Sequence, residues 1–477
     1  MSFISTTDNN LGKTLGELDC TSENTSNVYA DLSTIANTPI KELCEKNPAL
    51  LVFPHALGNH GDEIGTLKIC ELSGSLEQPQ NAKLTTNNLM GFIGYGNTQV
   101  TIKSRFSKGN ENDFFLHYML EKVFSINLFD FKHTSSNGGL DLLIFLFPAM
   151  LRKAIVQGVF KTYRNFKHND VNVKGAIDIP RHIQKNIPFA GRVAYNSRER
   201  TFDNAVTQLI RHTIEFIKTK PHGKRLITSN PDTKTDVEKI IQATQSYNYF
   251  DHNKTLAQNA KPINHAFFTA YRPLQKLCLA ILHHQKIAYY KNSHQIYGVL
   301  FDGAWLWEEY LAKVLQPCGF VHPKNKSGVG GIRMFAKDVD ETTFDKNHRR
   351  IYPDFYKPND RDGKNGVILD AKYKRLQNGV GRDDLYQIVT YMHTMKIDAG
   401  GFIYPIAKGE IQSSDPLQHQ RCQLAGYGGE VGVIGLVIPC VDKAKSVVQQ
   451  YEGFCEGMRV EEEKLRKVVR DIEVMLE

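Results

Sequence analysis

The sequence lacks closely spaced cysteines. Its eight cysteines are scattered over 477 residues, none of them forms a CxxC motif, and no Cys/His cluster has the spacing of a zinc site. In a chain of this length, scattered cysteines are typical of free thiols in a reducing compartment. This pattern argues against a secreted disulfide scaffold and against a structural zinc protein.

Long apolar runs are also missing. The most apolar stretch, residues 142–151, is much shorter than the roughly 20 residues that a membrane-spanning helix needs. The N-terminal segment MSFISTTDNN has neither the basic nor the apolar part of a secretion signal. We therefore expect a cytoplasmic protein that does not contact a membrane.

No phosphate-binding loop of the type G-x-x-x-x-G-K-[ST] occurs. The glycine-containing segments GNHGDEIG and GFIGYG lack the lysine that would contact a phosphate. We therefore do not expect this chain to hydrolyse nucleotides by that mechanism. The net charge of +8 permits a nucleic-acid partner but does not require one.

The apolar pattern divides the chain into four parts, and a length of 477 residues is compatible with about three domains. Residues 1–45 are rich in Ser, Thr, Asn and Asp, which predicts a flexible N-terminal arm. Short apolar runs between Gly and Asn turns predict a β-rich module over residues 46–110. Helical periods predict a helical middle region over residues 111–296, and strands alternate with helices over residues 297–477. The predicted fold class is α/β, and α+β overall.

Two helices of this pattern have specific expectations. Residues 203–217 form one apolar face and begin at Asp203, a predicted N-cap. Apolar residues recur at nearly heptad spacing from Met458 to Leu476. This C-terminal helix either docks on its own domain or contacts a partner.

The segment RIYPDFYKPNDRDGKNGVILDAKYKRL, residues 350–376, is the strongest candidate for chemistry. Asp354 follows a proline, and GVILDAKYK reads as a strand in which Asp370 and Lys372 point to the same face. The turn-forming residues between them predict that two strands pair as a hairpin. A surface hairpin with solvated charges is the simpler interpretation. The other is a metal site that cleaves a phosphodiester.

Phosphodiester hydrolysis uses this set of side chains. Carboxylate oxygens hold Mg²⁺, which retains several waters and is bound by few carboxylates together with substrate phosphate. A lysine beside the metal can orient the attacking water and balance negative charge. This interpretation also explains Asp370 within an apolar run, where an unpaired carboxylate would be costly.

Flanking helices supply further polar residues. WLWEEYL contributes Glu308 and Glu309 before the hairpin, and DDLYQIVTYMHTM follows it with Gln387 and Tyr391 on one helical face. Either glutamate could instead be a solvated charge, and Gln387 with Tyr391 could be an ordinary amphipathic face. Four basic residues near the hairpin are candidates for DNA phosphate contacts, or simply solubilising charges: Arg349, Arg350, Lys374 and Arg375.

The order of these motifs resembles the PD-(D/E)xK nuclease superfamily, particularly its members with a Q-x-x-x-Y helix. The resemblance implies a C-terminal nuclease domain over residues 297–477. It also implies a Mg²⁺ site held by two aspartates and one glutamate. Glu308 is preferred over Glu309 because it follows the aromatic Trp307, as in similar proteins. The implied catalytic set is Glu308, Asp354, Asp370, Lys372, Gln387 and Tyr391.

The resemblance extends to a narrower family, McrC, over residues 90–405. The segment LRKAIVQGVFKTYRNFKHNDVNVKGAIDIPRHIQKN is similar to the central part of that family, including its (R/K)G-x-I-D element. YNSRERTFDNAVTQLIRHTIEFI resembles the block that follows, and VTIKSRFSKGNENDFFLHYML resembles the junction after the β-rich module. The residues that match the central element are Lys174, Gly175, Ile177, Asp178 and Arg181.

The McrC resemblance implies the nuclease subunit of a modification-dependent restriction system. Such a subunit would cleave double-stranded DNA together with a separate AAA+ GTPase, a McrB-like protein that recognises modified cytosine. The β-rich module would dock on that partner. Three alternatives remain: a LlaJI-like subunit for a specific unmodified sequence, a PD-(D/E)xK nuclease of another DNA-processing pathway, and a non-catalytic activator. The intact Asp354, Asp370 and Lys372 argue against the last.

Overall fold

The computed structural model of the chain forms two compact units. Unit 1 combines residues 1–142 with residues 287–477, and unit 2 comprises residues 143–286. None of the described helices is both long and apolar enough to cross a membrane. The described residues are 2–18, 25–57, 63–107, 112–125, 138–220, 223–228, 230–289, 295–323, 330–335, 350–360, 365–376, 379–410, 420–426 and 428–474.

The first sheet of unit 1 has five strands, and one of them comes from far along the chain. In spatial order the strands are β1 (Ser2–Thr7), β7 (Thr98–Lys103), β6 (Leu89–Tyr95), β11 (Tyr297–Asp302) and β3 (Leu50–Phe53). β11 pairs antiparallel with β6 and parallel with β3. Gly91 and Gly298 permit this approach, because a Cβ at either would lie 2.2 or 2.4 Å from a carbonyl oxygen of the paired strand.

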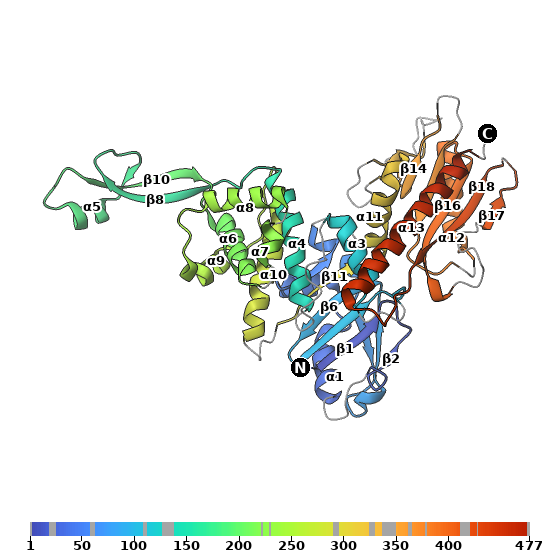
Figure 1. Cartoon of the computed structure of the whole chain (residues 1–477). Helices are drawn as coiled ribbons and strands as arrows, with labels where there is room; N and C mark the ends of the chain where they lie inside the picture. The colour runs from blue at the N-terminus through green and yellow to red at the C-terminus, as the bar shows by residue number, and fades with distance from the viewer. Residues whose placement is uncertain are drawn as a thin grey trace, which may run out of the picture. The chain divides into compact units, whose positions relative to one another are not determined.

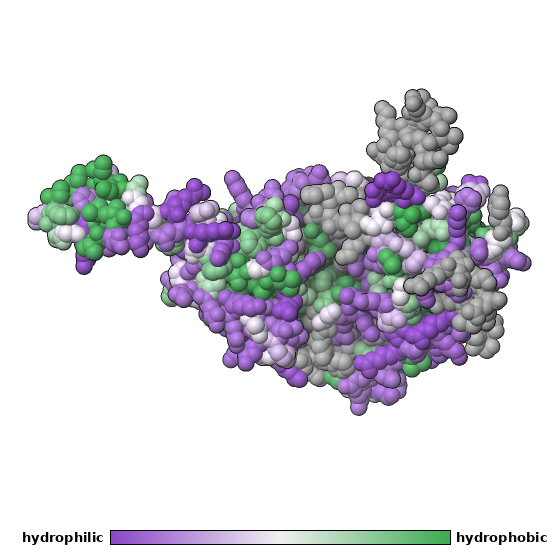
Figure 2. Space-filling view, turned by 90° about the horizontal axis from the view of Figure 1, so that it is seen from above, coloured by the Kyte–Doolittle hydropathy of each residue, from purple (hydrophilic) through white to green (hydrophobic). Residues whose placement is uncertain are grey.

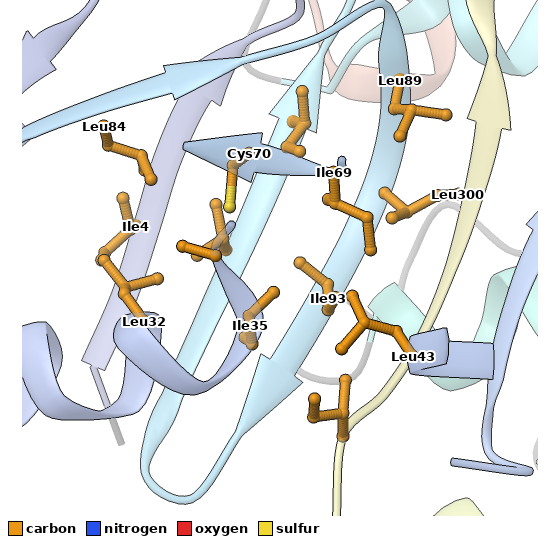
Figure 3. Close-up of a cluster of buried hydrophobic side chains, with 14 of the residues drawn as sticks. Ile4, Leu32, Ile35, Leu43, Ile69, Cys70, Leu84, Leu89, Ile93 and Leu300 are labelled. Carbon is orange, nitrogen blue, oxygen red and sulfur yellow. The ribbon is translucent and has the colours of Figure 1, made fainter. Parts of the chain in front are cut away.

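Smaller elements complete this part of unit 1. A three-stranded sheet has the order β2 (Lys13–Thr14), β5 (Lys83–Thr86) and β4 (Cys70–Ser73), and two helices cover the strands, α1 (Thr25–Ile35) and α2 (Ile40–Lys46). Their apolar side chains converge in one core (Figure 3), where Leu32 and Ile35 of α1 meet strand residues such as Ile4, Ile93 and Leu300.

The predicted flexible arm over residues 1–45 is wrong. Residues 2–7 form a strand whose Ile4 is buried, and α1 buries Val28, Leu32 and Ile35. These three helix residues have the i, i+4, i+7 spacing of an amphipathic helix. The polar composition of the segment concealed that spacing. The predicted β-rich module over residues 46–110 does contain strands. It is not a separate module, because β1 and β11 belong to its sheet and α1 belongs to its core.

The second sheet of unit 1 carries the candidate hairpin. Its order is β14 (Phe355–Lys357), β15 (Val367–Ala371), β16 (Ala399–Ala407), β18 (Glu430–Ile438) and β17 (Gln420–Gln423). β14 and β15 pair antiparallel, with Phe355 opposite Leu369, so the predicted hairpin is confirmed. β15, β16 and β18 run parallel. A two-stranded pair, β12 (Ile332–Arg333) with β13 (Arg350–Ile351), lies outside this sheet.

Four helices of unit 1 accompany these strands: α3 (Phe114–Phe124), α11 (Gly303–Leu315), α12 (Arg382–Met395) and α13 (Val447–Val474). α12 packs on β15 and β16, with Ile388 and Met392 seated against Gly400. α13 lies beside β18 (Figure 1) and contacts α3 and α11 as well. The C-terminal helix therefore docks on its own unit, which was one of its two predicted roles.

A buried carboxylate anchors α13. Glu462 is 1% exposed and accepts hydrogen bonds from the hydroxyls of Tyr118, at 2.7 Å, and Tyr310, at 2.9 Å. Lys122 and Arg466 lie 3.1 and 3.3 Å from its other oxygen. A buried charge requires such partners, and these come from α3, α11 and α13 itself.

Unit 2 combines helices with a three-stranded sheet. The helices are α4 (Gly138–Ile155, whose first turn belongs to unit 1), α5 (Ile179–Asn186), α6 (Ala205–Lys218), α7 (Gly223–Thr228), α8 (Pro231–Ala243), α9 (His252–Gln258) and α10 (Tyr271–Tyr289, whose last three residues belong to unit 1). The strands are β8 (Thr162–Asp170), β9 (Ala176–Ile177) and β10 (Val193–Thr201), in the order β8-β10-β9. Short 3₁₀ turns occur in both units, at His55–Leu57, Glu63–Thr66, Pro79–Asn81, Tyr249–Asp251, Gln316–Cys318 and Lys408–Glu410.

The antiparallel pair of strands β8 and β10 corrects the predicted helical middle region over residues 111–296. It extends away from helices α6, α8 and α9 of the same unit (Figure 1), and most side chains of β8 are exposed or half-buried. Strands without a buried face show no clear alternation of apolar residues, which is why the sequence pattern did not reveal them. Figure 2 shows apolar residues gathered at the far end of this strand pair, as is typical of an interaction surface. The exposed apolar residues there are Val171, Val173, Ile177, Ile179, Ile183, Ile187 and Phe189.

Helix α6 begins one residue later than predicted. Asn204, not Asp203, is the N-cap, and its side chain accepts hydrogen bonds from the backbone of Val206 and Thr207. Asp203 instead accepts hydrogen bonds from Gln208 and from the backbone of Ser246. Both residue types cap helices well, so local sequence alone did not separate them.

Unit 2 should lose stability in acid through one histidine. His212 of α6 is 4% exposed and packs against Tyr247 and His252. Burial, together with the neighbouring charges of His252 and Arg211, lowers the pKa of His212 from 6.5 to about 4. A lowered pKa means that the folded state favours the neutral ring. The stability from this group is therefore present above pH 6.5 and is lost as the pH falls toward 4.

We therefore predict that the His212→Phe variant of the full chain shows less acid destabilisation of α6 than the wild type. The difference, after allowance for solvent screening, is on the order of 1–2 kcal/mol between pH 6.5 and 4. Hydrogen exchange of α6 amides measures it. His265→Phe, in the same unit, serves as the control and should keep the wild-type slope. An unchanged slope in His212→Phe would contradict the assignment.

Candidate functional site

The hairpin places Asp354 at the end of β15. Asp354 follows Pro353 just before β14, and its Oδ2 accepts a hydrogen bond of 2.7 Å from the backbone N–H of Ala371. Its own carbonyl oxygen lies 2.8 Å from Nδ1 of His322. Both the side chain and the backbone of Asp354 are thus fixed by hydrogen bonds, and its carboxylate lies beside Ala371.

Asp370 and Lys372 point to one face, as predicted, and contact each other. Lys372 Nζ lies 2.6 Å from Asp370 Oδ2, and Asp370 is 2% exposed. Although β15 ends at Ala371, the N–H of Lys372 donates to the carbonyl of Ile403 at 2.9 Å, so strand pairing continues to the lysine. A second carboxylate, Asp384 of α12, lies 3.1 Å from Lys372 Nζ.

The electrostatics of this group favour a bound cation. Burial, with Asp370 and Glu308 nearby, raises the pKa of Asp354 well above its ordinary value. Burial also raises the pKa of Asp370, although Lys372 acts in the opposite direction. Burial would lower the pKa of Lys372, but Asp370 and Asp384 outweigh it and raise that pKa. Lys372 is therefore a fixed positive charge beside two carboxylates that repel each other, a repulsion that a cation relieves.

Glu308 is the helix glutamate whose charge acts on Asp354. It lies on α11 between the buried Trp307 and half-buried Glu309, and its Oε1 is 3.8 Å from His322 Nε2. It is also among the charges that raise the pKa of Asp354. Successive helix residues differ by about 100° in direction, so Glu309 faces elsewhere.

We therefore predict that Glu308→Gln reduces DNA cleavage by at least about tenfold, while Glu309→Gln leaves the rate within about twofold, because Glu308 is among the main charges that act on Asp354 and Glu309 is not. Single-turnover cleavage of plasmid DNA by the assembled complex measures both. The two variants are matched controls for each other, since both remove one half-buried carboxylate from α11. The reverse result would move the role to Glu309.

Gln387 and Tyr391 of α12 are joined to Lys372 by two successive hydrogen bonds. Lys372 Nζ donates to Gln387 Oε1 at 3.4 Å, and Gln387 Nε2 donates to the Tyr391 hydroxyl at 2.8 Å. Gln387 is exposed and Tyr391 is 8% exposed. The predicted helical face is therefore in contact with the hairpin, while its catalytic role remains a prediction.

Two residues of the site were missed from sequence. Asp384 pairs with Lys372 and, at 2.5 Å, with Lys374, and His322 links Asp354 to Glu308. Asp384 lies one helical turn before Gln387, so the same helical face could have revealed it. His322 is positioned by an isolated bridge between Val321 and Tyr356, a contact that no local pattern indicates.

The four predicted DNA-contacting residues have different surroundings. Arg349 lies outside the described residues, and Arg350 is exposed on β13. Lys374 pairs with Asp384, and Arg375 pairs with Glu410 at 2.8 Å, yet about half of each side chain is exposed. Contact with DNA phosphates therefore remains a prediction for all four.

The residues present fit Mg²⁺ as a two-carboxylate site. Asp354 and Asp370 are hard oxygen donors, and Mg²⁺ is usually bound by one or two carboxylates plus water and substrate phosphate. Among the described residues, no three His, Cys, Asp or Glu side chains form a metal-binding cluster, so Glu308 does not complete a three-ligand set in this geometry. Its role as a metal ligand remains a prediction.

The mixed sheets, together with the paired carboxylates and lysine at a strand end, fit a restriction-system protein. The family model described as McrBC 5-methylcytosine restriction system component matches residues 84–405. The chain belongs to this family, as a McrC protein. No curated protein matches the chain.

Two solved structures from Thermococcus gammatolerans are similar to this chain. One is a half-complex from a tetradecameric assembly of McrB AAA+ hexamers with bound McrC. It shows 12% identity and a TM-score of 0.46, and the match covers 96% of this chain and 99% of that chain. The other is a cryo-EM structure of the McrBC complex, with 13% identity and a TM-score of 0.34, covering 66% of this chain and 87% of that chain.

Proposed function

We propose that the chain is the Mg²⁺-dependent DNA endonuclease subunit of its restriction system. The observation that carries the proposal is the meeting of Asp354, Asp370 and Lys372 at the end of one hairpin strand. A solvated surface hairpin would not bury Asp370 to 2% exposure. A decayed, non-catalytic activator would have no reason to keep this costly pair of carboxylates.

Each side chain has a role in the proposed reaction. Mg²⁺, when bound by Asp354 and Asp370, would polarise the scissile phosphate and acidify water. The ammonium of Lys372, held by Asp370 and Asp384, would orient the attacking water and balance the charge that develops on the phosphate. Gln387 and Tyr391 would limit the directions that the lysine can take.

The partner follows from the family. In the T. gammatolerans structures McrC is bound to McrB AAA+ hexamers or is part of the McrBC complex. We propose that this chain likewise acts on double-stranded DNA with an AAA+ GTPase that recognises modified cytosine. The chain's lack of a G-x-x-x-x-G-K-[ST] loop agrees with a motor on another chain. The first sheet of unit 1 and the elements around it are the proposed docking module.

Co-expression with the product of the adjacent gene tests the proposal. The complex is incubated with methylated and unmethylated plasmid, with GTP or ATP, and with Mg²⁺ or EDTA. Cleavage of the methylated plasmid that needs GTP and Mg²⁺ supports it. Cleavage of a specific unmethylated sequence would indicate a LlaJI-like subunit, and cleavage indifferent to both partner and nucleotide would indicate another DNA-processing pathway.

A further inference from the structure

A single arginine gathers three segments of unit 1. Arg105 follows β7, and its side chain is 10% exposed. Its backbone N–H donates to Asp8 Oδ1 at 2.6 Å, and its Nη1 lies 3.3 Å from Asp8 Oδ2. Its Nη2 donates to Asn88 Oδ1 at 3.1 Å and to the carbonyl oxygen of Tyr373.

Tyr373 is the residue directly after Lys372. The Arg105 guanidinium lies over its ring, 4.8 Å from the centroid, and Phe106 packs edge-on against it at 5.1 Å. The Tyr373 hydroxyl lies 2.8 Å from Ser104 Oγ. Both the backbone and the side chain of Tyr373 are thus fixed by the segment that follows β7.

The same arginine also reaches the helix that carries Glu308. Asn88, which accepts from Arg105, donates to Asp302 Oδ1 at 3.4 Å, and its carbonyl accepts from Gly303 N at 2.8 Å. Asp302 is the N-cap of α11. The Arg105 guanidinium therefore links two elements of the site. It contacts the residue after Lys372 directly, and it contacts the start of α11 through Asn88.

We propose that Arg105 is a positioning residue of the nuclease site, which sets Lys372 and Glu308 at their mutual distance by holding Tyr373 and, through Asn88, the start of α11. The proposal rests on the nuclease function proposed above. Arginine suits this role because its planar fork supplies five donors in a rigid arrangement, whereas lysine supplies a flexible point charge.

The energetics of the pair agree with positioning rather than with stability. Asp8 is fully buried, and burial raises its pKa to about 7 despite the contact with Arg105. A buried ion pair with such a desolvation cost is often replaceable by apolar residues at no loss of stability. The presence of the Arg105–Asp8 ion pair is explained if its role is to fix the position of Arg105 beside Tyr373.

The test compares Arg105→Lys with the wild type in the assembled complex. A misplacement of about 1 Å can cost as much as a hundredfold in rate, so we expect the single-turnover rate at saturating DNA to fall at least about tenfold. The DNA concentration for half-maximal rate and the partner's nucleotide hydrolysis should stay within about twofold. In Arg105→Ala, free guanidinium at millimolar concentration should restore part of the rate.

Arg466→Lys is the matched control. Arg466 is a partly buried arginine of the same unit that donates to the carbonyl of Val314, at the other end of α11. We expect it to keep the wild-type rate, and melting curves of both variants report folding. If Arg105→Lys does not fold, Asn88→Ala decides, with an expected rate loss of several-fold and an intact complex.

Three results would overturn the inference: a wild-type rate in Arg105→Lys, an equal loss in Arg466→Lys, or a wild-type rate in Asn88→Ala. Parallel assays of Asp370→Asn distinguish a failure of the role of Arg105 from a failure of the proposed nuclease function. Loss of cleavage in Asp370→Asn with full cleavage in Arg105→Lys removes only the role of Arg105. Full cleavage in Asp370→Asn removes the nuclease assignment itself.

Discussion

Replacement of Asp370 with asparagine should abolish DNA cleavage by the assembled complex. Asp370 is buried, contacts Lys372 at 2.6 Å and supplies one of two carboxylates proposed for the metal. Loss of several kcal/mol of transition-state stabilisation corresponds to a rate loss of about a hundredfold to a thousandfold or more. Asp354→Ala and Lys372→Ala should have effects of the same size, because the three side chains act as a unit.

The fold should survive these changes. Asparagine has nearly the same shape as aspartate, and Lys372 keeps Asp384 as a partner at 3.1 Å. Asp383→Asn is the matched control, because Asp383 is an exposed carboxylate next to Asp384 on α12. Thermal melting and co-purification with the partner verify the structure of each variant. Wild-type cleavage by any one of the three site variants would remove that residue from the site.

The purified chain alone should show little specific double-strand cleavage in Mg²⁺, whereas the full system should cut. A free nuclease would damage the genome of its own cell, so we expect activity to depend on assembly. The expected increase is at least about a hundredfold on adding the AAA+ partner, nucleoside triphosphate and target DNA together, comparable to other cases in which a partner completes a phosphoryl-transfer site. Plasmid cleavage with each component omitted in turn measures it.

The control for this experiment is the complex that carries Asp370→Asn, which should assemble and hydrolyse nucleotide without cutting. Robust, site-specific cutting by the isolated chain without nucleotide would instead indicate a stand-alone nuclease.

Deletion of residues 1–110 is not a suitable variant for testing the dependence on the partner. It would strip β6 and β3 from both sides of β11 and remove Arg105 from Tyr373.

The sequence predicted the grouping of the candidate site residues better than it predicted the fold of residues 1–110. Asp370 and Lys372 share a strand, and Asp354 reaches them across a short turn-rich connection, so period-two alternation and turn residues were sufficient. Gln387 and Tyr391 likewise share a helical face. These relations are local, and a single sequence displays them.

The misses have a common physical origin. β11 lies between β6 and β3 although it follows both by more than 200 residues along the chain, and nothing near Tyr297 indicates these neighbours. His322 reaches Asp354 through one isolated bridge. The strand pair β8 and β10 has little buried surface and hence no alternating pattern. Each of these depends on tertiary pairing, which overrides local preference.

The place of β11 in the first sheet also determines the order in which parts of the chain can fold during translation. Unit 2 is one uninterrupted stretch, residues 143–286, and can fold as soon as it has emerged. The first sheet of unit 1 must wait with β6 and β3 unjoined until Tyr297–Asp302 has been synthesised. Nascent chains thus carry an incomplete sheet while residues 96–296 are synthesised, and the residues that would cut DNA are made only after the strand that joins β6 to β3.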